Sequence, residues 1–342
     1  MKVAIGYKLQ QGPWGGGNRF VNSLINALTA RGDQVVHNLD DDDIDIILMI
    51  DPRSRLDLFT FAGGEILRYL TFKNPNAIAI HRINECDQRK KTKTMNFRLR
   101  TANYAADHTV FVGSWLKDLS VWTADDHRDN SVILNGADET IFNDQGYQAW
   151  DGDSPLKLVT HHWGGNWMKG FDVYQQIDEM LGTEQWKDRI QFDYIGNVPK
   201  GFTFRNARLL EPQDAQHLNN TLSSYHVYVT ASMNEPGGNH QNEGALCGLP
   251  LIYRGSGCMD EYCKGFGEVF NGPDDFAGAL EKMMSNYPVH QANIKFYPHT
   301  ASTMVQRYLQ LFDELSEMRS AIVKHRQLWR NPLTYALNQI LR

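Results

Sequence analysis

Cysteine is scarce in this sequence, and no Cys-x-x-Cys pair occurs among Cys86, Cys247, Cys258 and Cys263. A disulfide framework or a zinc knuckle is therefore not predicted, and reduced thiols in a cytosolic protein fit the pattern. Long apolar runs are also missing. The first residues, MKVAIGYKL, lack the apolar stretch of a signal peptide. No run reaches the roughly 20 apolar residues that a membrane-spanning helix needs.

An excess of positive charge is missing as well. The chain has 34 Lys and Arg against 40 Asp and Glu, a net charge of −6. We therefore expect no nucleic-acid partner, and an anionic ligand would need a local basic or backbone site. The chain has 342 residues, of which 42% are hydrophobic. This length and hydrophobic content are sufficient for two folded domains, each with its own core.

Short apolar runs alternate with amphipathic helical patterns along the first part of the chain. This alternation predicts a parallel sheet with helices on both faces. The expected strands are residues 3–7, 34–39, 44–50, 77–83 and 108–114, followed by a last strand and turn in VILNGADETIFN (132–143). The segment DQGYQAWDGDSP (144–155) breaks the pattern with Gly, Asp and Pro, which indicates a linker.

The same cycle then restarts. We expect strands at 156–162, 189–196, 226–232 and 250–257, and helices at 170–181, from 239 onward and at 276–284. The sequence therefore predicts two doubly wound α/β domains, residues 1–150 and 151–318, followed by a helical segment, 319–342. In such folds ligands bind at the carboxyl ends of the strands.

A glycine-rich stretch, QGPWGGGNRF (11–20), links the first expected strand to the first helix. Its consecutive glycines allow the backbone to approach a ligand, and the helix after it offers free N–H groups to an anion. It is not a Gly-x-Gly-x-x-Gly fingerprint, because Phe20 occupies the third glycine position, so a nicotinamide dinucleotide site is poorly supported. A plain flexible turn is the alternative interpretation.

A second stretch, NEPGGNHQNEG (234–244), follows the expected strand 226–232. Gly237 and Gly238 remove side chains where the chain turns, and Asn239 is a suitable helix N-cap. The first turn of that helix would direct its N–H groups at an anionic ligand. Alternatively Glu235 is an idle surface carboxylate, or Glu243 only supports its own helix, although His240 stands where a capping box needs Ser or Thr.

Together these motifs resemble the Glu-x7-Glu signature of retaining GT-B glycosyltransferases, in the large family-four-like group and a bacterial branch of it. The resemblance spans nearly the whole chain and includes MKGFDVY (168–174), YIGN (194–197), HRINECDQRKKTK (81–93) and ADHTVFVGSWL (106–116). It implies an α/β GT-B fold with two Rossmann-like domains facing across a cleft, the first on the acceptor side and the second on the donor side. It also implies that residues 319–342 cross back to the first domain.

The resemblance assigns roles to particular residues. Glu235 would be the carboxylate beside the donor sugar, Glu243 the ribose ligand and Lys169 the cation on the diphosphate. The remaining donor-binding residues would be Gly16 and Gly17 at the pyrophosphate, and Gly237, Gly238 and Asn239, which would lend backbone amides to the sugar. An arginine that the family usually adds before the lysine is replaced by Trp163 in THHWGGNWMKG. Helix N-termini, or His161 and His162, are the expected substitutes for it.

His81 follows the apolar run AIAI, and a histidine at the carboxyl end of a strand lies where ligands bind in such folds. The resemblance implies a catalytic position near the donor sugar; a core histidine bonded to backbone is the alternative. No metal is expected, because adjacent His161 and His162 should point to opposite faces of a strand. DGD (151–153) is interpreted as a solvated turn.

These expectations describe a cytoplasmic, metal-independent, retaining glycosyltransferase. It would move a sugar from a nucleotide-diphospho sugar, with UDP favoured over GDP, to an acceptor hydroxyl on a glycan, a lipid-linked or another molecule. No cofactor besides this co-substrate is expected. A sugar-nucleotide epimerase of the same fold and a non-catalytic nucleotide-sugar binding subunit stay open as alternatives. Two segments could contact an anionic membrane peripherally: the basic segment 89–93 and the amphipathic segment 317–342. The alternative is that the first is a solvated loop and the second packs within the protein.

Overall fold

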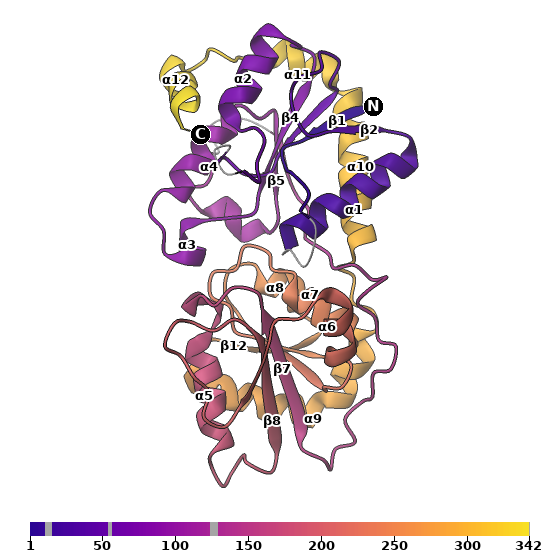
Figure 1. Ribbon diagram of the computed structural model, residues 1–342, viewed down its shortest axis with the longest axis vertical. Coiled ribbons are helices and arrows are strands. Elements are labelled where there is room, and N and C mark those ends of the chain that lie inside the picture. Colours follow the sequence, from indigo (N-terminus) through magenta and orange to yellow (C-terminus); the bar gives the residue numbers. More distant parts are fainter. Residues whose placement is uncertain (11–15, 54–56, 124–128, 342) are drawn as a thin grey trace. The chain divides into compact units, whose positions relative to one another are not determined.

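The computed structural model describes residues 1–10, 16–53, 57–123 and 129–341. The chain divides into two compact units, Met1–Leu134 with Thr303–Arg342, and Asn135–Ser302 (Figure 1). The sequence placed this division at residue 150 and the returning segment at 319, so both boundaries lie earlier in the structure. The expected linker belongs to the second unit because its aromatic residues pack there. The Trp150 ring lies edge-on to Tyr287, and the backbone N–H of Trp150 donates to the Tyr287 hydroxyl at 3.1 Å.

The first unit is built on a six-stranded parallel sheet in the order β2-β1-β3-β4-β5-β6. Its strands are short and mostly buried, as expected for a parallel sheet covered on both faces. Their bounds are β1 (Lys2–Ile5), β2 (Gln34–Val36), β3 (Ile46–Met49), β4 (Ile78–Ile83), β5 (His108–Phe111) and β6 (Asp129–Val132).

Helices cover both faces of this sheet. Its helical elements are α1 (Gly16–Arg31), α2 (Gly63–Phe72), α3 (Asp87–Lys90), α4 (Met95–Asn103), η1 (Ser114–Asp118), α10 (Ala301–Glu317), α11 (Arg319–His325) and α12 (Pro332–Ile340). One core packs α1 and α10 against alternate strand residues, and a second core packs α2 and α4 against the others. The helix α1 ends before Gly32, whose φ of 88° is the left-handed value that commonly terminates a helix.

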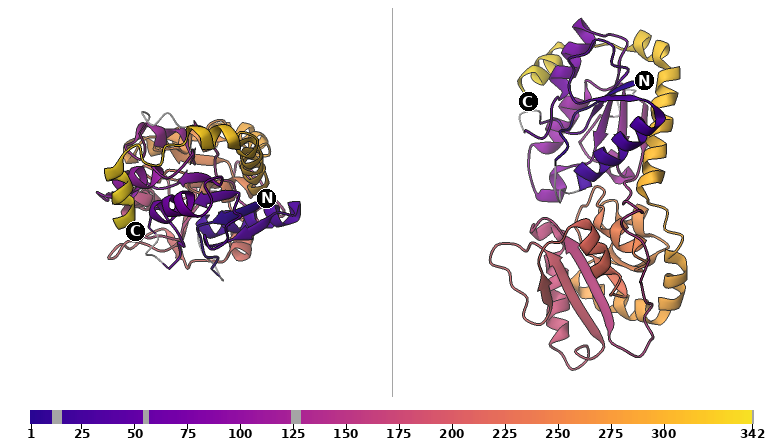
Figure 2. Two further views of the ribbon diagram at one scale, coloured as in Figure 1. Left: turned by 90° about the horizontal axis from the view of Figure 1, so that it is seen from above. Right: turned by 45° about the vertical axis from the view of Figure 1, so that its right-hand side comes forward.

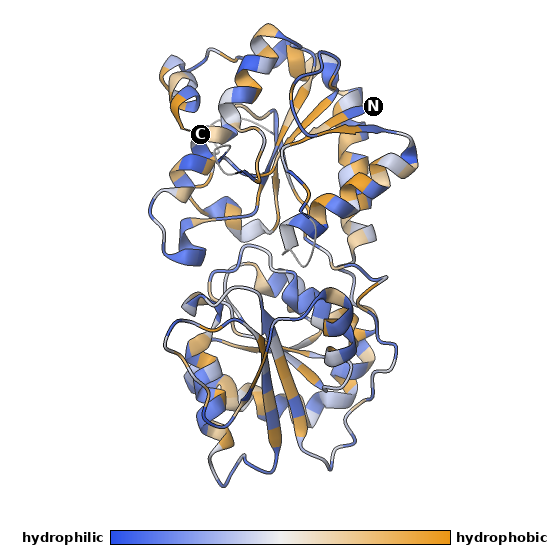
Figure 3. Ribbon diagram, in the orientation of Figure 1, coloured by the Kyte–Doolittle hydropathy of each residue, from blue (hydrophilic) through white to orange (hydrophobic). Residues whose placement is uncertain are grey.

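The second unit repeats this architecture around a parallel sheet ordered β12-β11-β10-β7-β8-β9. The strands are β7 (Leu156–His162), β8 (Ile190–Gly196), β9 (Arg208–Leu210), β10 (Val227–Thr230), β11 (Leu251–Arg254) and β12 (Gly267–Phe270). The helical elements are η3 (Trp167–Lys169), α5 (Phe171–Leu181), α6 (Ala215–Leu222), α7 (His240–Leu246), α8 (Met259–Cys263) and α9 (Pro273–Ile294). In Figure 3 the strands of the first sheet are coloured mainly hydrophobic, while hydrophobic and hydrophilic residues alternate along helices such as α1.

Each sheet reverses its strand order at one point. In the first sheet the chain moves from β1 outward to β2 and returns to β3 on the other side of β1; in the second it moves from β7 to β8 and β9 and returns to β10 on the other side of β7. Ligands of doubly wound folds bind at the carboxyl ends of the strands beside such a point. In the second unit a ligand site is therefore expected at the segments after β7 and β10.

The C-terminal segment packs against the first unit (Figure 2). The helix α12 begins at Pro332, as Asn331 and Pro332 predict, with the Asn331 side chain accepting from the Thr334 N–H at 3.0 Å. Its buried Asn338 donates to the Thr101 carbonyl at 2.8 Å. The approach to α2 is close: a Cβ on Gly63 or Gly64 would overlap Asn338. None of the described helices is long and apolar enough to span a bilayer.

Gly64→Ala should therefore destabilise the protein by roughly 1–3 kcal/mol, since the added methyl group displaces α12 from α2. Chemical denaturation measures the loss. Gly278→Ala is the matched control: Gly278 lies in α9 with nothing within 4 Å of an added Cβ, so alanine there should stabilise by up to about 1 kcal/mol. Equal effects of the two substitutions would contradict the close packing of α12.

Candidate functional site

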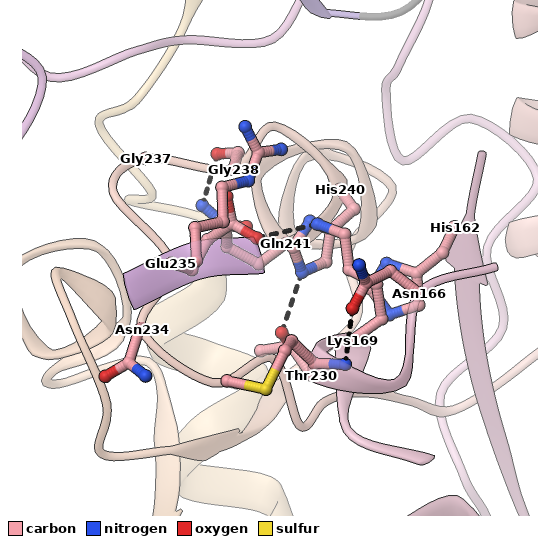
Figure 4. A network of polar contacts seen from close by, with 12 residues as sticks. His162, Asn166, Lys169, Thr230, Asn234, Glu235, Gly237, Gly238, His240 and Gln241 are labelled. Atoms are coloured by element: carbon pink, nitrogen blue, oxygen red, sulfur yellow. Dashed lines mark hydrogen bonds and ion pairs between the residues drawn. The ribbon is translucent and has the colours of Figure 1, made fainter. Parts of the chain in front are cut away.

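Polar and charged residues gather at the point where the strand order of the second sheet reverses. β7 ends in His161 and His162, and Lys169 closes the short helix η3 that follows it. The chain after β10 carries Glu235 and then enters α7. Figure 4 shows this group, with side chains from both segments directed toward one another. The site residues expected in the second domain are thus brought together.

An ion pair connects the two segments. Lys169 Nζ lies 2.6 Å from Glu235 Oε2, with the lysine side chain 17% and the glutamate side chain 2% exposed. The lysine reaches this place because η3 lies directly against the end of β10: Gly170, at a φ of 99°, comes so close to Ala231 that a Cβ would overlap it. Asn166 begins the turn by accepting from the Met168 N–H at 2.8 Å.

Glu235 is fixed by its backbone. Its carbonyl oxygen accepts from the Cys258 N–H at 2.9 Å, and it forms a bridge with Gly257. Gly257 has a φ of 66°, and a Cβ there would lie 2.6 Å from the Glu235 nitrogen, so only glycine permits this approach. Asn234 before it adopts a left-handed φ of 51° and donates its N–H to the Ser256 hydroxyl at 2.9 Å. The loop 255–258 therefore sets where the carboxylate stands.

The Gly237–Gly238 turn is held by side-chain amides that the sequence analysis missed. Asn135 Nδ2 donates to the Gly237 carbonyl and Gln241 Nε2 to the Gly238 carbonyl, each at 2.6 Å. A Cβ on Gly238 would lie 2.6 Å from the His240 ring, which explains the glycine sterically. Asn135 belongs to the Asn-Gly pair of VILNGADETIFN, a motif that was noted only as a strand and turn.

Asn239 occupies the N-cap position of α7, but its side chain makes no capping hydrogen bond, contrary to the prediction. Its backbone is already near the helical region, at a φ of −101° and a ψ of −19°, rather than the extended geometry of a capping asparagine. Within the described residues, three buried atoms around this turn have no hydrogen-bond partner: Ser232 Oγ, Asn239 Oδ1 and Gln241 Oε1. Buried polar atoms are normally paired, so these atoms suit the hydroxyl groups of a ligand.

Glu243, the second glutamate of the motif, is buried in the first turn of α7. Its Oε2 lies 2.7 Å from His161 Nε2. His162, the next residue, bonds instead to the Tyr174 hydroxyl at 2.7 Å. The predicted difference in direction between the two histidines is therefore seen in their partners, Glu243 for His161 and Tyr174 for His162.

Both histidines nevertheless lie close to His240, which the sequence analysis considered only as the residue at the capping-box position. The ring centroids of His162 and His240 are 4.5 Å apart, those of His161 and His240 6.4 Å, and His240 Nε2 lies 2.7 Å from the Thr230 hydroxyl. Burial, with His240 and Lys169 nearby, lowers the pKa of His162 well below its usual value, so it is neutral. The described residues contain no cluster of three or more potential metal ligands.

His81, expected at the carboxyl end of the run AIAI, lies inside β4, which continues to Ile83 as the strand expected over 77–83 does. Its side chain is fully buried, with Nδ1 2.9 Å from Asn103 Oδ1. An amide oxygen only accepts, so Nδ1 carries the proton. His81 Nε2 has no partner among the described residues. Burial lowers the pKa of His81 to about 4, so near neutral pH the imidazole is uncharged and Nε2 is a hydrogen-bond acceptor.

The glycine loop is described only in part, because Gln11–Gly15 lie outside the described residues. Gly16 and Gly17 form the start of α1. A Cβ on Gly17 would meet Tyr7 no closer than 3.9 Å, an ordinary contact. Asn18 fixes the other end of the loop, accepting from the Gln10 N–H at 2.8 Å and donating to the Gln10 carbonyl at 3.0 Å.

Trp163 stands where the family arginine was expected. Its side chain is 56% exposed, and its carbonyl accepts from Asn197 Nδ2 at 2.6 Å. Asp151 of the DGD segment accepts from Ser154 and Asp153 backbone N–H groups, and these hydrogen bonds lower its pKa to about 2. That segment is an exposed turn, as predicted.

Two parallel six-stranded sheets with interleaved helices give the chain an α/β fold of the GT-B type. The chain resembles sucrose-phosphate synthase from Thermosynechococcus elongatus (TM-score 0.68, 14% identity, 92% of this chain and 98% of that chain). It also resembles a glycosyltransferase from Rickettsia africae (0.59, 12%, 95% and 98%) and HepE from Anabaena in complex with UDP and glucose (0.61, 10%, 91% and 99%). No family model matches the chain, and no curated protein matches it in sequence.

Breaking the Lys169–Glu235 pair from one side should destabilise the ligand-free protein. Lys169→Met removes the ammonium group from a buried carboxylate, which should lower the free energy of unfolding by about 3 kcal/mol. The double variant Lys169→Met with Glu235→Leu should recover most of that loss, and the cycle gives the coupling. Lys187→Met, in the exposed Lys187–Glu184 pair, should change stability by less than about 1 kcal/mol. Additive single effects at Lys169 and Glu235 would contradict the pair.

The buried neutral state of His81 predicts a pH effect on stability. The folded-state pKa of about 4 lies below the usual 6.5, so the unfolded chain binds a proton first and stability is lost as pH falls from about 6.5 toward 4. From pH 7.5 to pH 5 this group alone should remove about 2 kcal/mol. Urea unfolding of wild type and His81→Gln at both pH values measures it. An unchanged pH dependence in the variant would show that His81 is not buried neutral.

Proposed function

We propose that the protein is a retaining glycosyltransferase that transfers a sugar from a nucleotide-diphospho sugar to an acceptor hydroxyl. The observation that carries the proposal is the Lys169–Glu235 pair, held at the strand-order reversal of the second sheet by glycines on both sides. The GT-B fold supports it, as does the UDP and glucose bound to the similar HepE structure.

The chemistry needs a positive group at the leaving diphosphate. Negative charge grows there as the glycosidic bond breaks, and preorganised charges and N–H groups that meet this charge lower the barrier. In this proposal Lys169 supplies a compact ammonium group for that charge, and no metal ion takes part. In this proposal the ammonium exchanges Glu235 for the diphosphate, with Gly16 and Gly17 approaching the pyrophosphate.

The sugar would lie beside Glu235 and the Gly237–Gly238–Asn239 turn. Asn239 Oδ1, Gln241 Oε1 and Ser232 Oγ, without partners among the described residues, offer hydrogen bonds to its hydroxyl groups. His81, whose Nε2 is a hydrogen-bond acceptor, stays the candidate catalytic residue of the first unit. Glu243 stays the candidate ligand of the ribose. UDP is the favoured donor nucleotide, and the protein would work in the cytoplasm without a further cofactor.

Ligand binding separates these roles. Lys169→Ala should weaken UDP binding about tenfold or more but leave uridine nearly unchanged, because a charge-assisted hydrogen bond of about 1.5–3 kcal/mol is lost only where phosphate is present. Glu243→Gln should weaken both ligands. Glu235→Gln should keep UDP affinity and lose turnover. Calorimetry and a transfer assay measure these effects.

A Lys169→Ala protein that still prefers UDP over uridine as wild type does would refute the diphosphate assignment. Product analysis with radiolabelled nucleotide sugars tests the reaction itself. Transfer with retained anomeric configuration is expected. An epimerised nucleotide sugar, or tight binding without any product, would replace the proposal by one of the two alternatives.

A further inference from the structure

A buried hydrogen-bonded chain of three side chains lies behind the site. Tyr228 from β10, His161 from β7 and Glu243 from α7 are all buried. The Tyr228 hydroxyl lies 3.0 Å from His161 Nδ1, and His161 Nε2 lies 2.7 Å from Glu243 Oε2. The rings of Tyr228 and His161 meet edge to face, with centroids 5.5 Å apart. Three separate elements are therefore connected through one imidazole.

These contacts place the protons. A carboxylate oxygen only accepts, so His161 Nε2 donates to Glu243. Burial raises the pKa of Tyr228 well above its usual value, so the hydroxyl keeps its proton. That hydroxyl accepts from the backbone N–H of His161 at 3.1 Å. It also has two acceptors within reach, His161 Nδ1 and the His161 carbonyl oxygen at 3.3 Å. It can donate to Nδ1 beside a neutral imidazole and to the carbonyl beside a charged one. The bond from His161 to Glu243 persists in either state.

We propose that His161 is a positioning residue of the donor site, which orients the Glu243 carboxylate toward the ribose hydroxyls of the nucleotide while Tyr228 holds the imidazole. The inference rests on the proposed function, which puts Glu243 at the ribose. A glutamate side chain has several rotatable bonds, and fixing it before the ligand arrives removes an ordering penalty from binding. Residues that hydrogen-bond a ligand-binding side chain from behind commonly fix its orientation. His161 thereby has a role distinct from the missing arginine.

A chemical double cycle tests this role. The dissociation constants of UDP and 2′,3′-dideoxy-UDP are measured by calorimetry for wild type, His161→Leu, His161→Gln and Tyr228→Phe. In wild type, removal of the two ribose hydroxyls should weaken binding about tenfold or more. In His161→Leu, UDP should bind about tenfold more weakly and the dideoxy analogue as in wild type, so the ratio between the ligands falls toward one.

Two volume-preserving variants guard against a loss of folding. His161→Gln keeps an N–H donor near the place of Nε2 and should restore most of the UDP-to-dideoxy ratio, whereas Tyr228→Phe should give an intermediate ratio. His162→Leu is the matched control: His162 is also buried and bonded to a tyrosine, but to Tyr174 rather than to the Glu243 network. It should melt at lower temperature and retain the wild-type ratio.

The outcomes separate the two proposals. A wild-type protein that binds both ligands equally would show that Glu243 does not contact the ribose, which overturns that part of the proposed function and this inference with it. A wild type sensitive to the hydroxyls, with His161→Leu equally sensitive, would overturn the role of His161 alone. Equal weakening of both ligands in His161→Leu would likewise reduce His161 to a structural residue.

Discussion

The ion pair between Lys169 and Glu235 is the interaction on which the arrangement of the second unit's site depends. It joins the segment after β7 to the segment after β10, at the point where the strand order reverses. A carboxylate as buried as that of Glu235 needs a cation close by, because an unpaired charge there is strongly unfavourable. The backbone brings both groups into reach through Gly170 against Ala231 and Gly257 against Glu235, two approaches that a Cβ would block.

The same ammonium group is the one that a diphosphate would require. In our account Lys169 stabilises the ligand-free site through Glu235 and the leaving group through its phosphate oxygens, so ligand binding and the ion pair are exclusive. The surrounding turn fits this exchange: its carbonyls are held by Asn135 and Gln241, and other polar atoms of the turn have no partner among the described residues. A site that is rigid in its backbone and incomplete in its hydrogen bonds is suited to a polyhydroxylated, anionic ligand.

Periodicity predicted what local sequence determines. The run LKLVTHH matches β7 to the residue, and Pro332 begins α12, because apolar spacing and proline geometry act over a few neighbours. Contacts between segments far apart in the chain could not be predicted from the sequence. Nothing local indicates that Asn135 holds Gly237, that Gly63 and Gly64 pack against α12, or that Tyr147 and Trp150 attach the expected linker to α9.

The prediction for Asn239 failed for a related reason: composition favours a cap, but the turn around Gly238 sets another backbone geometry. His81 was assigned to the carboxyl end because the apolar run AIAI stops there. The strand expected over 77–83 nevertheless runs past it, as β4 does, through polar residues that are buried by their neighbours.

The separation of Lys169 Nζ and Glu235 Oε2 with UDP bound tests the central claim most directly. It is 2.6 Å in the ligand-free chain. A crystal structure of the UDP complex should show the two atoms beyond hydrogen-bond reach, with Nζ on a phosphate oxygen. An intact ion pair in a crystal with UDP bound would contradict the account, because the cation that we assign to the diphosphate would then still neutralise Glu235.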